Sequence, residues 1–196
     1  MFIENFFGWL SLIIVALWVL ITIKKNPLVA NFIFTAFIIR ALFVILDQYF
    51  LVLPGSTADA IRFEQKAQNY SDEYGLSILL YLFQYDSYFL SRFLSLFYTV
   101  FDHSPMMAKN ISVFFGTATV LLTYRLSSML WGDIIAIKAG WFAALFPSLI
   151  LYSAIILREP YITFFILYTL IACTSFFKKK SIYSLFQLLF GFFILT

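Results

Sequence analysis

The chain contains several apolar stretches that are each long enough to cross a lipid bilayer as a helix. Such a crossing takes about 20 apolar residues, and a helix satisfies its own backbone hydrogen bonds inside the membrane. With 63% hydrophobic and only 12% charged residues, the chain has more apolar surface than a soluble domain of 196 residues can bury. The sequence therefore predicts an all-α, polytopic transmembrane helix bundle, one membrane domain over residues 1–196. Its predicted spans, about six, are residues 6–23, 28–53, 107–131, 134–157, 161–177 and 182–196.

One long polar stretch, residues 53–74, follows the second predicted span. We predict a short helix from residue 57 to about residue 70, because Phe63, Ala67 and Tyr70 form an apolar stripe on an otherwise polar segment. Such a helix is amphipathic and is expected to lie on the membrane surface. It belongs to a large first outer loop, residues 54–105, where we expect the chemistry of the protein. The charged residues of the stretch are Asp59, Arg62, Glu64, Lys66, Asp72 and Glu73.

The lysines predict which ends of the spans face the cytoplasm, because cytoplasmic loops are rich in Lys and Arg. Lysines occur at 24–25 and at 178–180, and both clusters fall inside only if residues 75–101 do not cross. We therefore predict that residues 75–101 form one or two juxtamembrane helices, broken near Asp86, on the outer side. In the span 134–157, Pro147 predicts a kink.

Asp59 is the first candidate for chemistry, and its position allows two interpretations. In one, the run from Ser56 to Asp59 is a capping box, with Asp59 bonding back to the start of the helix. In the other, the Asp59 carboxylate accepts a proton from an incoming hydroxyl at the membrane face. Sequence spacing leaves both open.

Three further charged residues stand out because the membrane makes them costly. Arg158 and Glu159 lie in a predicted outer turn, where Arg158 either extends to the interface or neutralises a lipid-linked phosphate. Arg40 lies near the middle of a predicted span, where charge costs at least about 3 kcal/mol. It must face protein or water, and we expect it to bond backbone carbonyls or, through water, Asp47.

Metal and nucleic-acid sites find little support in the composition. The chain has one cysteine, Cys173, and one histidine, His103, so Cys-based and His-rich metal sites are excluded. Carboxylates could still hold a divalent ion, but no metal ligand set and no cofactor is firmly implied. The net charge of +3 is small and its basic residues are scattered, so no nucleic-acid partner is expected.

Three segments together resemble a known family. They are LPGSTADAIRFEQKA at 53–67, NISVFFGTATVLLTYRLSSMLWG at 110–132 and LFPSLILYSAIILREP at 145–160. The pattern resembles the N-terminal part of bacterial GT-C-fold glycosyltransferases, polytopic enzymes related to protein O-mannosyltransferases and lipid A aminoarabinose transferases. The resemblance covers about residues 38–177.

The resemblance implies a donor, a reaction and a place for each site residue. The donor would be a polyprenyl-phosphate sugar, and transfer to an envelope or lipid-linked acceptor would invert the anomeric centre. Asp59 matches the catalytic base of the first outer loop, and Arg158 and Arg62 would hold the donor phosphate. The supporting residues would be Glu64, Glu159 and Arg40. The expected location is a bacterial inner or plasma membrane, with the active face outside the cytoplasm.

The sequence departs from the family in two respects, and these leave other functions open. Ala60 follows Asp59 where many relatives have a second acid, and the chain ends at Thr196 inside an apolar run. We therefore also expect that it is a fragment or a minimal or inactive relative. The alternatives are a non-catalytic carrier or translocator of lipid-linked sugars and an assembly subunit that pairs with another membrane protein.

Overall fold

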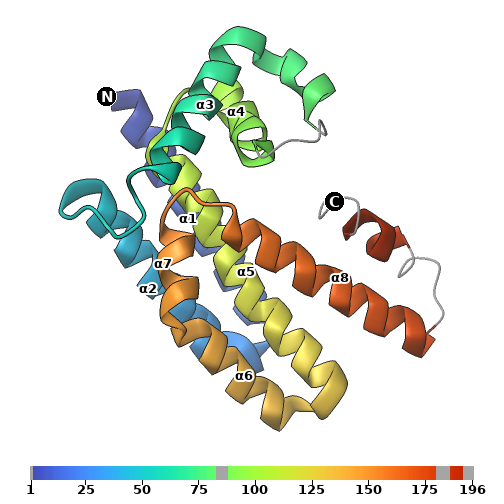
Figure 1. The fold of residues 1–196 in the computed structure, drawn as a ribbon. Coiled ribbons are helices and arrows are strands. Elements are labelled where there is room, and N and C mark those ends of the chain that lie inside the picture. The colour runs from blue at the N-terminus through green and yellow to red at the C-terminus, as the bar shows by residue number, and fades with distance from the viewer. Residues whose placement is uncertain (1, 83–87, 180–185, 192–196) are drawn as a thin grey trace.

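The structure is a computed structural model and describes residues 2–82, 88–179 and 186–191. Over these residues it consists of helices joined by short loops, without a β-strand. The predicted all-α class is therefore confirmed for the described part of the chain. Figure 1 shows a bundle of long helices with a group of shorter ones at one end.

Within the described residues, four helical segments are long and apolar enough to cross a membrane. A fifth span results if the bent pair α6 and α7 counts as one. The segments are α1 (Phe2–Lys25), η1 with α2 (Pro27–Val29 and Ala30–Tyr49), α5 (Pro105–Trp131), the pair α6 (Asp133–Leu145) and α7 (Pro147–Ala154), and α8 (Glu159–Lys179). They match the first five predicted spans, whereas most of the sixth, 182–196, lies outside the described residues.

One boundary differs from the predicted one because of a polar contact. The second span ends at Tyr49 rather than at residue 53, because Asp47 turns back to bind the following loop: its Oδ1 accepts a hydrogen bond from the Leu53 N–H at 2.8 Å. The predicted kink at Pro147 is confirmed as a break, with 54° between α6 and α7. Proline cannot donate the next helical hydrogen bond, so the first helix ends before it.

Helix α5 lies in the centre of the bundle and packs against α1, α2, α6, α7 and α8. Close packing is possible because α5 carries small residues at its contacts. Gly116 is one of them: a Cβ atom there would lie 2.3 Å from Cβ of Ser153 on α7. The position of α7 against α5 therefore depends on a missing side chain.

The polar stretch forms a group of helices at one end of the bundle. This group contains α3 (Asp59–Tyr74), η2 (Gly75–Tyr81) and α4 (Phe89–Phe101). Helix α3 packs against α4, and the group lies where α2 ends and α5 begins (Figure 1). Ala67 is fully buried in this contact, while Phe63 and Tyr70 are half-buried. The break predicted near Asp86 lies outside the described residues.

Helix α3 starts two residues later than the sequence predicts, and the capping box is wrong. Ala58 occupies the N-cap position with φ of 50°, and no side chain caps the helix. The Ser56 hydroxyl instead donates a hydrogen bond to Asp47 Oδ2 at 2.8 Å. Asp59 is therefore the first residue of the helix, and its carboxylate is not used in a cap.

The described lysines of the two clusters lie at the other end of the bundle from α3. Lys24 and Lys25 end α1, and Lys178 near the end of α8 donates a hydrogen bond to the Met129 carbonyl near the end of α5. Figure 1 shows these helix ends opposite the α3 group. Lys24, Lys25 and Lys178 thus share one end of the bundle, and the prediction that this end faces the cytoplasm remains a prediction.

We expect Glu73 on α3 to face the outside and Lys138 on α6 to face the cytoplasm, by the charge bias of membrane proteins. Both residues are exposed. In a Cys173→Ser background, a membrane-impermeant maleimide should label Glu73→Cys in intact cells and Lys138→Cys only after permeabilisation. Labelling of both from one side would contradict the topology.

Candidate functional site

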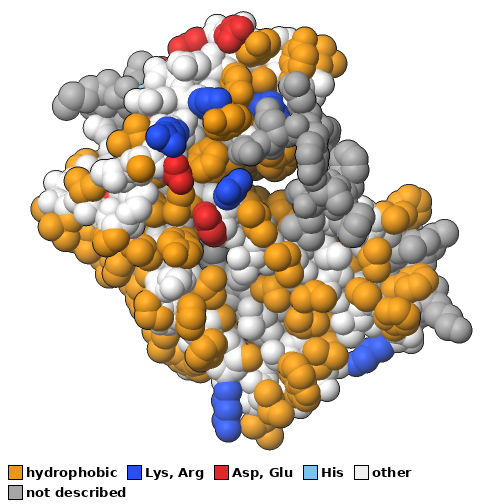
Figure 2. Space-filling view, in the orientation of Figure 1, with side chains coloured by type: hydrophobic (Ala, Val, Ile, Leu, Met, Phe, Trp, Pro, Cys, Tyr) orange, Lys and Arg blue, Asp and Glu red, His pale blue; other side chains and the backbone are white. Residues whose placement is uncertain are grey.

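The start of α3 packs against the loop that joins α7 to α8. Ala60 on α3 and Ile156 in the loop belong to one buried cluster, and a Cβ atom on Gly55 would lie 3.3 Å from Ile155. Asp59 precedes Ala60, and Arg158 follows Ile156 by two residues. Figure 2 shows acidic and basic side chains gathered on this face, over the first part of α3 and the loop before α8.

Asp59 and Arg62, the predicted base and one predicted phosphate ligand, form an exposed ion pair. Arg62 Nη1 lies 3.6 Å from Asp59 Oδ1, one turn apart on α3, and the side chains are 76% and 70% exposed, respectively. An exposed pair of this kind contributes at most about 1 kcal/mol to stability. Both groups are therefore available to a ligand without a large loss of folding energy.

Arg158 and Glu159 come next to each other where α8 begins, but their surroundings differ. Arg158 is exposed, and within the described part of the chain its side chain has no ion-pair partner. Glu159 is half-buried, and its Oε2 is buried without a hydrogen-bond donor among the described residues. The structure thus presents one uncompensated cation beside a poorly satisfied carboxylate.

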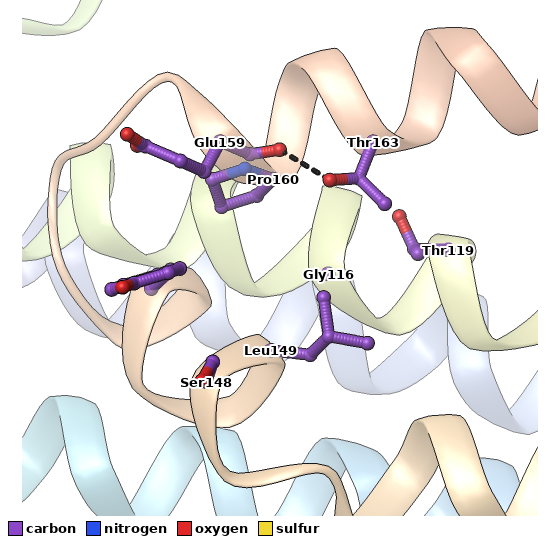
Figure 3. A pocket seen from close by; sticks show the side chains of 8 residues that line it. Gly116, Thr119, Ser148, Leu149, Glu159, Pro160 and Thr163 are labelled. Carbon is purple, nitrogen blue, oxygen red and sulfur yellow. Dashed lines mark hydrogen bonds between the residues drawn. The ribbon is translucent and has the colours of Figure 1, made fainter.

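A cavity of about 200 Å³ lies between α5, α7 and the start of α8. Figure 3 shows the Thr163 hydroxyl bonded to the Glu159 carbonyl, at 2.8 Å, while the Glu159 carboxylate points away from Thr119 and Thr163. The lining is mostly apolar with a few hydroxyls, which suits a lipid chain better than a charged group. The residues that line it are Gly116, Thr119, Ser148, Leu149, Tyr152, Glu159, Pro160 and Thr163.

A second polar cluster, which sequence reasoning missed, joins the end of α2 to α5. Lys109 Nζ lies 2.9 Å from Asp47 Oδ2, with side-chain exposures of only 12% and 1%, and it also donates to Gln48 Oε1 at 2.9 Å. The sequence signal that could have revealed this pair is that Asp47 and Lys109 carry opposite charges and lie at the same predicted end of two spans. Asp47 was expected only as a water-mediated alternative partner of Arg40, whereas the structure pairs its carboxylate directly with Lys109.

Glu64, predicted as a supporting residue, is paired with the only histidine of the chain. Its Oε1 contacts His103 Nε2, and the two side chains are 17% and 24% exposed, so Glu64 is far less exposed than Asp59. The ring of Tyr98 stands edge-on to His103 at 4.9 Å. Burial, with the charge of Glu64 as a second cause, raises the pKa of Tyr98 well above its usual range, so this phenol stays protonated.

A small cavity of about 120 Å³ lies between these two clusters. It is bounded by side chains from the loop after α2, from α3, from the start of α5 and from the α7–α8 loop. The lining residues are Ser56, Ala60, Ile61, Glu64, Pro105, Lys109 and Ile156. Ala60 and Ile156 line the cavity and also form the contact between α3 and the α7–α8 loop. The cavity therefore adjoins the surface that carries Asp59 and Arg158.

Arg40, the third supporting residue, lies inside the bundle and contacts none of these charges. Its side chain is fully buried, and Nε donates to Ser153 Oγ at 2.9 Å. Nη1 donates to the carbonyls of Ala36 and Ala144, and Nη2 to that of Ala143, at 3.0, 3.2 and 3.4 Å. The expected bonding to carbonyls is confirmed. Two of these carbonyls, those of Ala143 and Ala144, lie at the end of α6, where the helix breaks before α7.

Within the described residues, no three His, Cys, Asp or Glu side chains come together in a way that could hold a metal ion. Comparisons with protein-family models, with curated proteins and with solved structures found no match to this chain. The resemblance to GT-C-fold transferases therefore stays a prediction from the sequence.

Proposed function

We propose that this chain is a membrane glycosyltransferase, or the part of one that binds the donor. It would move a sugar from a polyprenyl-phosphate donor to an envelope or lipid-linked acceptor on the outer side of a bacterial membrane. The observation that carries this proposal is the packing of α3 against the α7–α8 loop. This packing brings an exposed acid, Asp59, to the same end of the bundle as Arg158, a cation without a partner among the described residues.

The chemistry needs a base, a cation for the leaving phosphate and an apolar path for the lipid. Asp59 would take the proton of the acceptor hydroxyl as its oxygen forms a bond to the anomeric carbon. The bond from that carbon to the phosphate oxygen breaks from the opposite face, and its electron pair leaves with the phosphate. The configuration is thereby inverted, and polyprenyl phosphate is released.

Arg158 and Arg62 would stabilise the phosphate in this step. Arg62 is paired with Asp59 at 3.6 Å. A phosphate that draws Arg62 toward itself would free the Asp59 carboxylate for the acceptor hydroxyl, because guanidinium binds phosphate through two parallel hydrogen bonds. The mostly apolar cavity that includes Glu159 lies toward the membrane spans and would accommodate the first part of the lipid chain.

Donor binding and transfer, measured separately in vesicles that contain the purified protein, test this proposal. A panel of radiolabelled polyprenyl-phosphate hexoses and pentoses serves as donor, and a lipid extract of the native membrane as acceptor. We expect Asp59→Asn to lower transfer by about 100-fold or more, the scale of general-base catalysis, with donor binding retained. Arg158→Ala should weaken donor binding instead.

Asp72→Asn is the matched control, because Asp72 is an exposed carboxylate on the same helix but near its other end. It should leave both measurements unchanged. Donor binding without transfer in every protein, the wild type included, would instead favour a carrier or translocator. If the isolated chain shows neither donor binding nor transfer, the result would favour an assembly subunit that pairs with another membrane protein.

A further inference from the structure

The small cavity beside Glu64 and Lys109 has the chemistry of a binding site, yet its charges do not suit a phosphate. The Lys109 ammonium is already compensated by Asp47 at 2.9 Å. Glu64 adds a carboxylate to the lining. An anion in this cavity would therefore meet a neutralised cation and a negative charge, whereas Arg158 is an exposed cation with no ion-pair partner among the described residues.

The same groups suit neutral hydroxyls. Glu64 uses Oε1 for His103, and Oε2 has no hydrogen-bond donor among the described residues, so it can accept from a hydroxyl. Lys109 carries three N–H donors, of which the carboxylate of Asp47 and the amide oxygen of Gln48 engage two. Acceptor and donor thus line one cavity, as recognition of a sugar hydroxyl requires.

Both groups are held in place rather than mobile. Asp47 and Gln48 fix the ammonium of Lys109 from α2, and His103 fixes Glu64 from the loop between α4 and α5. Ordered polar groups bind a ligand with less loss of conformational entropy than freely rotating ones. Ala60 and Ile156 form the apolar part of the lining, and they adjoin Asp59 and Arg158.

We propose that this cavity is a subsite for a neutral, hydroxyl-bearing sugar, bound through Glu64 and Lys109. This inference rests on the proposed function and adds to it that two separate places bind the ligands: Arg158 binds the phosphate, and the cavity binds the sugar. The sugar comes from either the donor or the acceptor, since both present the same hydroxyl chemistry.

Protection of a cysteine at Ile61 tests the subsite without requiring transfer. Ile61 lines the cavity and is 44% exposed, so Ile61→Cys in a Cys173→Ser background should react with a maleimide. Gln65→Cys, on an exposed position of α3 outside the cavity lining, is the control. The probes are polyprenyl-phosphate sugars, polyprenyl phosphate without sugar, and methyl glycosides in solution.

We expect sugar-bearing probes to slow labelling at position 61 and to leave position 65 unchanged. Protection by the lipid-linked sugars assigns the cavity to the donor sugar, and protection by methyl glycosides assigns it to the acceptor. Glu64→Gln should raise the probe concentration for half-maximal protection about tenfold, the loss of one charge-assisted hydrogen bond.

Two results would overturn the subsite. Equal protection by polyprenyl phosphate without sugar would show that the cavity takes lipid or phosphate. Absence of protection by every probe would reject it as a sugar site, while donor binding that depends on Arg158 would leave the proposed transferase standing. Conversely, protection by methyl glycosides without any donor binding that depends on Arg158 would support the sugar subsite and reject the proposed transferase.

Discussion

Replacing Asp47 by alanine should destabilise the folded protein by about 3–5 kcal/mol, the usual cost of removing one partner from a buried ion pair. The Lys109 side chain, which is only 12% exposed in the structure, would then carry its charge without the carboxylate partner. The Leu53 N–H and the Ser56 hydroxyl would also lose their acceptor. The loop between α2 and α3 would thereby lose two hydrogen bonds that attach it to α2. The free energy of unfolding, from SDS titration in mixed micelles, measures the loss.

A double-mutant cycle separates the ion pair from the loop contacts. Asp47→Asn removes the charge but keeps an oxygen acceptor for the loop, and Lys109→Met removes the ammonium at similar length. We expect each single variant to be less stable than the double variant, because only the singles leave a buried charge without a partner. Additive losses in the double variant would show that the pair contributes no coupling.

Arg40→Leu is the second large effect, with an expected loss of about 3 kcal/mol in unfolding free energy from two buried carbonyls left without donors. The reason lies at the break between α6 and α7. Pro147 has no N–H to bond the carbonyl of Ala143, one turn earlier, and Arg40 supplies the missing donors to Ala143 and Ala144. Membrane insertion should improve, since a charge is removed from the span.

Arg40→Lys and Thr35→Val are useful controls for this effect. Lysine keeps the charge but has no planar fork, so it should recover only part of the stability. Thr35 lies half-buried on the same helix, away from the described hydrogen bonds of Arg40, and its change should be nearly neutral. A protein with Arg40→Leu that is as stable as the wild type would show that the carbonyls at the break find other donors.

Apolar run length was enough to predict the helical class and the places of the five apolar helical segments, because the bilayer sets a minimum length for each crossing. The break at Pro147 was also predictable from the missing N–H. The end of the second span was not, since it depends on Asp47 binding Leu53 and Ser56 in a loop that carries little signal of its own.

Most of the candidate site could not be read from the sequence, because its contacts join distant segments. Glu64 and His103 are 39 positions apart, and Lys109 meets Gln48 over 61 positions. Arg40 was recognisable as a costly residue, but apart from the Ala36 carbonyl on its own helix its partners lie on α6 and α7, more than 100 positions away. Only Asp59 and Arg62, one turn apart on α3, could be paired by spacing alone.

The central claim is that the start of α3 and the α7–α8 loop share one surface, with Asp59 and Arg158 both on it. Crosslinking in native membranes tests this most directly, with pairs of cysteines at 59 and 158 or at 72 and 158, in a Cys173→Ser background. Position 72 lies on the same helix, about 20 Å farther along its axis. A bismaleimide with a reach of about 10 Å, the separation at which two groups can act on one donor, should join 59 to 158 and not 72 to 158. Preferential joining of 72 to 158, or no product from 59 and 158 although each cysteine reacts singly, would contradict the account.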